Sequence, residues 1–228
     1  TLAWQHQGRP IAGWLAARFV ADRDELELAL SPALAPAAGA VVQRLRQALD
    51  LDADPSAIDA ALSSLPGAAG TRVPSGVCGW EIAVRVILGQ QVTVTAARTL
   101  TARLVERFGE PIATPFADLT RLFPSARRIA DASADDIGRL GIVRQRVGAL
   151  QALAREVAAG RIALHRGAPL QPTLDALIAL PGIGEWTLQL IAMRALAWPD
   201  AFPASDIGVL NALATRDAKA AGAIAQAW

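Results

Sequence analysis

Cysteine and histidine are scarce in this sequence, which limits the metal sites that it can build. Its 228 residues include one cysteine, Cys78, and two histidines, His6 and His165. One cysteine cannot close an internal disulfide or supply the several thiolates of a zinc finger or an iron–sulfur cluster. Because the histidines lie far apart, with no acidic residue at ligand spacing, we expect structural or surface roles for both and no metal site.

Long apolar runs are missing as well. No stretch of roughly eighteen residues or more, the length of a membrane span, is free of polar residues and proline. The residues that follow Thr1 show no basic-then-apolar targeting pattern. We therefore expect no contact with a membrane and a cytoplasmic location. The hydrophobic content of 53% predicts a well-buried core.

A strong charge of either sign is also absent. The formal net charge is +1, whereas proteins that hold nucleic acids by bulk electrostatics are strongly basic. Any binding to DNA must therefore depend on local geometry. Lys219 is the only lysine among many arginines, a bias that we interpret as the mark of a genome rich in G and C.

The first part of the chain combines strand and helix patterns. Apolar residues alternate over residues 11–15 and 25–30, which predicts a short antiparallel sheet. Helical spacing follows at residues 41–49 and 54–62, and a connection rich in Gly and Pro ends near residue 76. We therefore expect a small α+β domain over residues 1–70.

Beyond Val77 the patterns are helical and are interrupted by Gly and Pro. We expect helices at about residues 79–89, 92–108, 115–122, 125–130, 134–138, 142–159, 173–179, 185–197, 206–214 and 216–226. The second domain, residues 77–228, is therefore predicted to be all α.

Two glycines lie in residues 180–187, Leu-Pro-Gly-Ile-Gly-Glu-Trp-Thr, between two helical patterns. Gly182 and Gly184 allow a tight turn and the close approach of a ligand, and the next helix presents free N–H groups with a positive partial charge. Such a turn can hold a phosphate without a basic side chain. A plain interhelical turn explains the same pattern.

A second feature lies downstream, where Pro203, Ser205 and Asp206 end an irregular segment and open a helix. Ser205 or Asp206 is predicted to cap that helix, which contributes on the order of 1 kcal/mol. A carboxylate at this position would also lie beside a DNA strand that the preceding hairpin holds.

In this order, the motifs resemble the helix-hairpin-helix/Gly-Pro-Asp superfamily of DNA glycosylases. Residues 86–92, Val-Ile-Leu-Gly-Gln-Gln-Val, resemble the matching segment of the AlkA-type 3-methyladenine DNA glycosylase II. The resemblance implies a partial TATA-binding-protein-like α+β unit, followed by a mainly α helix-hairpin-helix domain. The family pattern extends past both Thr1 and Trp228, so we expect the last helix of the glycosylase domain to be lacking and activity to be weakened.

This resemblance implies a monofunctional enzyme that flips 3-methyladenine and 7-methylguanine out of double-stranded DNA and hydrolyses the N-glycosidic bond in base excision repair. Asp206 takes the place of the catalytic carboxylate, which stabilises positive charge on the sugar. Gly182, Gly184 and Thr187 take the places that hold the phosphate backbone. A monomer without a cofactor is implied, with a monovalent cation at the hairpin carbonyls as an option of the family.

The resemblance also implies a base pocket. Trp186 lies where lyases of the superfamily carry a Schiff-base lysine, and Lys219 is remote from the motif, so no lyase activity is expected. The indole can stack on a cationic base with a gain of roughly 0.5–2 kcal/mol. Leu190 replaces a tyrosine of the family, and Trp80 could line the same pocket. Core packing is the minority interpretation for Trp186, whereas helical spacing makes a core position the more frequent one for Trp80.

Gln90 and Gln91 lie where the family inserts a loop into the duplex. A side chain wedged into the gap offsets part of the cost of flipping a base. Gln91 stands where a leucine is expected and could hydrogen-bond the orphaned base. Exposure at a helix end explains Gln90 as well as a role in DNA binding does.

Two other functions stay open. The chain could be a glycosylase for oxidised or deaminated bases, because the lining of the pocket cannot be derived from the sequence. It could also be a non-catalytic helix-hairpin-helix DNA-binding part of an Ada-like adaptive-response regulator. Asp206 argues against a purely binding role, since binding to a polyanion does not require an acid.

Overall fold

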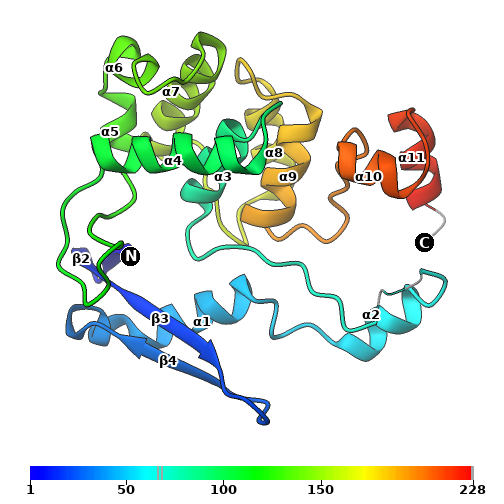
Figure 1. The fold of residues 1–228 in the computed structure, drawn as a ribbon, viewed down its shortest axis with the longest axis horizontal. Helices are drawn as coiled ribbons and strands as arrows, with labels where there is room; N and C mark the ends of the chain where they lie inside the picture. Colours follow the sequence, from blue (N-terminus) through cyan, green and yellow to red (C-terminus); the bar gives the residue numbers. More distant parts are fainter. Residues whose placement is uncertain (66, 68, 227–228) are drawn as a thin grey trace.

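The protein folds into a small N-terminal unit with strands and a larger helical domain, which lie one below the other in Figure 1. The computed structural model describes residues 1–65, 67 and 69–226. The expected combination of an α+β unit and a mainly helical domain is therefore confirmed. Within these residues, no helix has the length and the apolar character needed to cross a bilayer.

The N-terminal unit contains two separate hairpins where one antiparallel sheet was expected. Strand β1 (Leu2–His6) pairs with β2 (Arg9–Gly13), and β3 (Leu15–Phe19) pairs with β4 (Leu26–Leu30). The break falls after Gly13, where Ser31 and Leu34 pack so closely that a Cβ atom on Gly13 would lie 2.0 Å from Ser31 Oγ. The chain turns at this contact, and the sheet does not continue.

Helices complete this unit and give it a core of its own. The 3-10 helix η1 (Pro32–Ala37) leads into α1 (Ala38–Ala48), and α2 (Pro55–Ala61) follows. Leu2, Leu34 and Val41 are buried together under the first hairpin and α1. Asp54 caps α2 by accepting hydrogen bonds from two backbone N–H groups, as its Asp-Pro sequence predicts.

The second domain is built from helices joined by turns and by longer loops, such as the one between Phe108 and Ala126. They are α3 (Gly79–Leu88), α4 (Val94–Phe108), α5 (Ala126–Ala130), α6 (Ala134–Gly138), α7 (Arg144–Ala158), α8 (Leu170–Ile178), α9 (Glu185–Ala195), α10 (Ile207–Ala212) and α11 (Ala218–Ala225). Helix α3 lies at the centre and packs against α4, α7 and α9. Ile87, Leu150 and Ile191 are fully buried there, and each such side chain stabilises the fold by about 1.5–3 kcal/mol.

One expected helix, residues 115–122, is absent from the structure. The segment turns back on itself instead, with Ile112 N donating to Thr120 O at 2.9 Å and Leu122 N donating to Glu110 O at 2.9 Å. The Thr114 hydroxyl accepts a hydrogen bond from Phe116 N at 3.1 Å and donates one to a backbone carbonyl. Such side-chain bonds compete with helix formation, which explains why the helix predicted for residues 115–122 does not form.

Polar and aromatic contacts fix the two units against each other. Arg194 on α9 donates to Pro74 O at 3.0 Å, and the Ser75 hydroxyl donates to the carbonyl of Arg194. Trp14 meets Phe116 edge-to-face, with ring centroids 5.5 Å apart. The loop between α4 and α5 thus contacts the N-terminal unit, and the C-terminal end of α9 is bonded to the connection between the two units.

Candidate active site

The hairpin, residues 180–184, joins α8 to α9 through a turn that needs glycine at one position. Gly182 has a φ of +78°, and a Cβ atom on it would lie 2.9 Å from Ala149 Cβ on α7. Gly184 has a φ of −97° and caps α9, and no heavy atom would lie within 4 Å of a Cβ placed there. Gly182 is therefore fixed by packing, whereas Gly184 faces open space that a ligand can enter.

Thr187, in the first turn of α9, does not face that open space. Its exposure is 3%, and its hydroxyl oxygen accepts a hydrogen bond from the side-chain amide of Gln90 at 2.8 Å. We expected backbone and hydroxyl groups of Gly182, Gly184 and Thr187 to hold the phosphate; the Thr187 hydroxyl is bonded to Gln90 instead, and the contact of this residue with DNA stays a prediction. Thr187 instead links α9 to the turn after α3.

Gln90 and Gln91 have opposite surroundings, although they are neighbours in the loop of residues 89–93. Gln90 is half-buried, and its amide also donates to Gly182 O at 2.8 Å. Gln91 is exposed and has a φ of +51°, a left-handed conformation that is uncommon outside glycine. The side chain of Gln91 is thus accessible to DNA, whereas the side chain of Gln90 is bonded to the hairpin.

Asp206 lies at the start of α10, and both of its carboxylate oxygens have partners. Oδ1 accepts a hydrogen bond from Gly208 N at 2.8 Å, which confirms the predicted N-cap. Oδ2 accepts a hydrogen bond from the indole Nε1 of Trp186 at 2.7 Å. Each oxygen keeps a further lone pair, so the half-buried carboxylate can still accept a hydrogen bond from water or interact with a cation.

Trp186 therefore joins the hairpin to the Asp206 element across 20 residues of sequence. Its ring is half-buried and packs against the core, and the bond to Asp206 fixes the plane of the indole. Leu190, one turn further along α9, is also half-buried at the edge of the same core. The two side chains lie on the same face of α9, as the spacing of four residues requires.

Gln189 is a site residue that the sequence did not single out. Its Oε1 accepts a hydrogen bond from Phe202 N at 3.0 Å, and its Nε2 donates to Glu185 Oε1 at 2.7 Å. The first bond ties α9 to the segment that leads to Asp206. The spacing of four residues between Glu185 and Gln189 indicated only the second.

Trp80 has a place in the core instead of the site. Its ring is 9% exposed, and its indole N–H donates to Pro124 O at 2.8 Å. An indole that is packed on its faces and bonded at its nitrogen is not available to a ligand. The core position, one of the two interpretations of this tryptophan, is the one that the structure supports.

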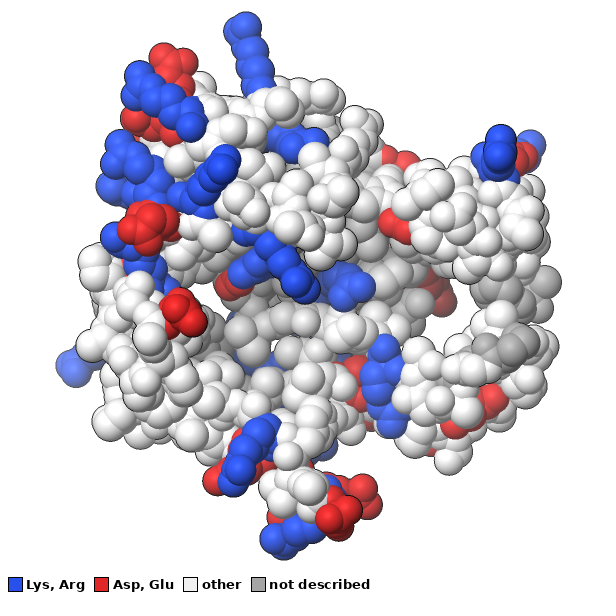
Figure 2. All heavy atoms as spheres, in the orientation of Figure 1, with Lys and Arg blue, Asp and Glu red and all other residues white. Residues whose placement is uncertain are grey.

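The charges on the face in Figure 2 form no continuous basic surface. Arginines and acids intermix over α4, α5 and α6 at the upper left, and further Lys or Arg side chains gather near the centre of this face. Ion pairs such as Arg85–Glu81, at 2.6 Å, neutralise part of the arginine charge. The backbone N–H groups at the start of α9 carry a positive partial charge that attracts a phosphate near Gly184.

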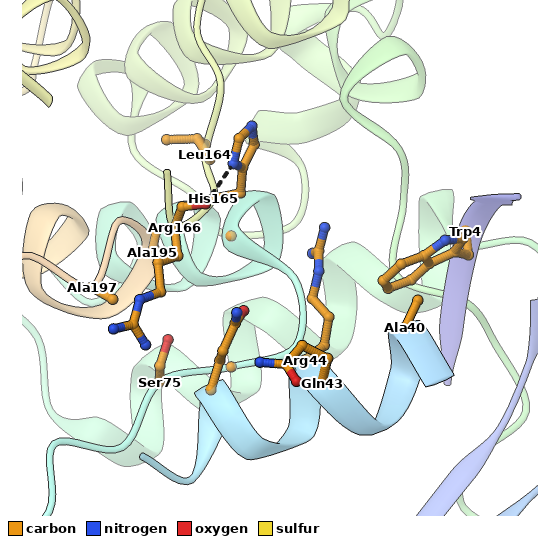
Figure 3. A pocket seen from close by; sticks show the side chains of 13 residues that line it. Trp4, Ala40, Gln43, Arg44, Ser75, Leu164, His165, Arg166, Ala195 and Ala197 are labelled. Atoms are coloured by element: carbon orange, nitrogen blue, oxygen red, sulfur yellow. Dashed lines mark hydrogen bonds between the residues drawn. The ribbon is translucent and has the colours of Figure 1, made fainter. Parts of the chain in front are cut away.

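A separate hollow of about 290 Å³ lies between α1 and the helical domain (Figure 3). Trp4 and Arg44 line it from the N-terminal unit, and His165 and Arg166 line it from the other side. The Arg44 guanidinium lies 4.6 Å from the centre of the Trp4 ring, which it approaches face-on as in a cation–π contact. None of the motif residues lines this hollow, which is therefore distinct from the candidate active site.

Two family models match separate parts of the chain. A family model for the AlkA N-terminal domain matches residues 1–77, and a model for the HhH-GPD superfamily base excision DNA repair protein matches residues 84–218. The first domain model ends where the connection meets α3. The second contains the hairpin, the 89–93 loop and the Asp206 element.

Several curated relatives match over most of this chain, and two of them illustrate the range of names. A Mycobacterium tuberculosis protein named "Probable bifunctional transcriptional activator/DNA repair enzyme AlkA" is 42% identical over an alignment of 173 residues, and the match covers 73% of this chain and 34% of that protein. The Escherichia coli DNA-3-methyladenine glycosylase 2 is 32% identical over 185 residues, 81% of this chain and 65% of that protein. The chain thus spans about a third of the first relative and just under two thirds of the second.

A solved structure shows the same fold. The 3-methyladenine DNA-glycosylase from Archaeoglobus fulgidus superposes with a TM-score of 0.74 at 22% identity, over 98% of this chain and 79% of that one. At this level of identity, the likeness establishes the arrangement of the N-terminal unit and the helical domain.

Proposed function

Because the chain belongs to the HhH-GPD superfamily of base excision DNA repair proteins, we propose that it is a DNA glycosylase for alkylated purines such as 3-methyladenine and 7-methylguanine. It flips the damaged base out of double-stranded DNA and hydrolyses the N-glycosidic bond. The names of the Escherichia coli relative and the Archaeoglobus fulgidus structure support this substrate class.

The observation that carries the proposal is the position of Asp206 relative to the hairpin. Its carboxylate is held by Trp186 from α9, the helix that the hairpin opens, and by Gly208 N of its own helix. Departure of the base builds positive charge on the sugar, and a fixed carboxylate stabilises that charge and orients the attacking water. An acid without this task would oppose the binding of a polyanion.

Trp186 has two tasks in the proposed mechanism. Its N–H fixes the carboxylate of Asp206, and its half-buried ring offers a surface for the flipped base. An alkylated purine carries a positive charge, and a cation against an aromatic face gains roughly 0.5–2 kcal/mol. Leu190 adds an aliphatic wall one turn away, in place of a second aromatic ring.

We further propose that the enzyme is monofunctional and acts as a monomer in the cytoplasm. A lyase of this superfamily needs an amine at the position of Trp186 to form a Schiff base. Lys219, the only lysine of the chain, lies in the first turn of α11, 33 positions after Trp186 in the sequence. Without that amine, the product is an intact abasic site.

A second context is supported by the Mycobacterium tuberculosis relative, whose name combines transcriptional activation with DNA repair. The matched segment is 34% of that protein, so the chain could form the glycosylase part of a longer regulator. Asp206 favours a catalytic part over one that only binds DNA.

The experiment that tests the proposal measures free bases released from DNA treated with a methylating agent. We expect release of 3-methyladenine and 7-methylguanine by the protein. If it binds this DNA but releases neither base, the glycosylase proposal is wrong. Release from duplexes with oxidised or deaminated bases, but not from methylated DNA, would favour the alternative substrate class.

A further inference from the structure

We propose that Gln90 is a positioning residue that holds the 89–93 loop, and with it Gln91, at a fixed distance from the hairpin. The inference rests on the proposed function. Gln91 is the side chain expected to enter the gap left by the flipped base, here called the wedge, and such a side chain has a function only in an enzyme that flips a base. It assigns to Gln90 a role inside the protein in place of the direct contact with DNA that its sequence position indicated.

The side chain of Gln90 uses both hydrogens of its amide to span the hairpin. One bond reaches Gly182 O in the turn, and the other reaches Thr187 Oγ1 in the first turn of α9, each at 2.8 Å. The partners lie 92 and 97 residues further along the chain. Gln90 is half-buried and Thr187 is buried, so the bonds are partly shielded from competing water.

Helix α7 supports the same junction from a third direction. Arg146 donates to the backbone carbonyl of Gln90, and the side chain of Ala149 packs against the backbone of Gly182. The loop, the hairpin and α7 therefore meet at one point, and Gln90 contributes its side chain and its backbone to that point. A displacement of the loop would break bonds to two other elements.

Gln91 follows directly and is exposed, with a left-handed φ of +51°. A residue other than glycine costs on the order of 1–2 kcal/mol in this conformation, so it persists only where its surroundings enforce it. The bonds of Gln90 provide that constraint on the N-terminal side, and Thr93, the cap of α4, provides it on the C-terminal side. The direction of Gln91 is thus set by residues that do not touch DNA.

This arrangement couples two steps of base flipping. A phosphate held at Gly184 fixes one strand relative to the hairpin, and Gln90 fixes the wedge relative to the same hairpin. Gln91 can then offset the cost of flipping only while this distance is maintained, because a wedge that retracts leaves the gap in the stack unfilled. Loss of the two hydrogen bonds of Gln90, here called the tether, should therefore reduce the rate of base release most in duplexes in which flipping the base costs the most free energy.

The test replaces Gln90 by methionine, which has a similar length but no donor. Single-turnover release of 7-methylguanine is measured with the base opposite cytosine and opposite a tetrahydrofuran abasic analogue, where flipping is cheap. For Gln90→Met we expect a loss of roughly tenfold opposite cytosine and of less than about threefold opposite the analogue. Gln151→Met is the matched control, because Gln151 on α7 also donates its amide to a carbonyl, Ala132 O at 2.8 Å, outside the site.

A double-mutant cycle with Gln91→Ala tests whether Gln90 acts through its neighbour. We expect the combined loss in Gln90→Met/Gln91→Ala to match that of Gln91→Ala alone, because a tether without a wedge has no effect. Equal losses on both duplexes, additive losses, or the same context dependence in Gln151→Met would overturn the inference while leaving the proposed function intact. If the unmodified protein releases no base, the proposed function fails, and the inference fails with it.

Discussion

The two glycines of the hairpin should respond to alanine in opposite ways. At Gly182, a side chain must adopt a φ of +78° and place its Cβ 2.9 Å from Ala149 Cβ. The left-handed conformation costs roughly 1–2 kcal/mol, and relief of the close contact raises the total to about 2–4 kcal/mol. For a chain of this length, Gly182→Ala should lower the Tm by roughly 4–16 °C.

Gly184→Ala should leave the Tm nearly unchanged and weaken the binding of DNA. No atom would lie within 4 Å of the new methyl group, and the φ of −97° suits any residue. The methyl group occupies the space that a phosphate must enter to reach the N–H groups of α9. Loss of one or two charge-assisted hydrogen bonds, at about 1.5–3 kcal/mol each, weakens the affinity by roughly tenfold or more.

Fluorescence anisotropy with a duplex that contains a stable abasic analogue, together with thermal melts of both variants, separates the two effects. Gly138→Ala is the matched control for Gly184→Ala, because it also adds a methyl group in open space and lies on α6, away from the hairpin. If Gly184→Ala binds DNA as tightly as the unmodified protein, the hairpin does not hold the phosphate through its backbone.

Three further outcomes follow from the contacts of the tryptophans and of the lone lysine. Trp186→Phe keeps a ring but removes the hydrogen bond to Asp206, and we expect base release to fall by roughly tenfold with little change in DNA affinity; an unchanged rate would show that the bond has no part in the reaction. Trp80→Phe loses the bond to Pro124 O and should lower the free energy of unfolding by about 1 kcal/mol without affecting base release. Slower base release by a stably folded variant would show that Trp80 contributes to the base pocket. Borohydride treatment during turnover should trap no covalent adduct with DNA, whereas an adduct that persists in Lys219→Arg would reveal an amine nucleophile outside this account.

The helices could be predicted from the sequence because their signals are local. Apolar spacing, Gly, Pro and capping residues such as Asp54 and Ser133 act within a few positions, and the structure places helices at nearly all the expected segments. The failures are local patterns that distant contacts override. Residues 115–122 form a turn held by hydrogen bonds of the Thr114 side chain in place of the expected helix. The two hairpins separate where Ser31 and Leu34 pack on Gly13.

The candidate site was only partly predictable for the same reason. The sequence places Asp206 at a helix start and glycines in the hairpin, and both features are in the structure. Nothing local indicates that Gln90 reaches Gly182, or that Trp186 donates to Asp206 across a loop. Such bonds depend on how whole helices pack, so a pattern of residue types can suggest the members of a site but not their partners.

The central claim is that the Asp206 carboxylate stabilises the positive charge that builds on the sugar as the base departs, and one rate comparison tests it most directly. Asp206→Asn keeps an oxygen for Gly208 N but removes the charge, and Asp217→Asn makes the same change at the cap of α11, where Asp217 accepts from Lys219 N at 2.9 Å. In single-turnover release of 7-methylguanine, we predict a loss of about 10²–10³-fold for Asp206→Asn and almost none for Asp217→Asn. Equal rates for Asp206→Asn and the unmodified protein would contradict the account.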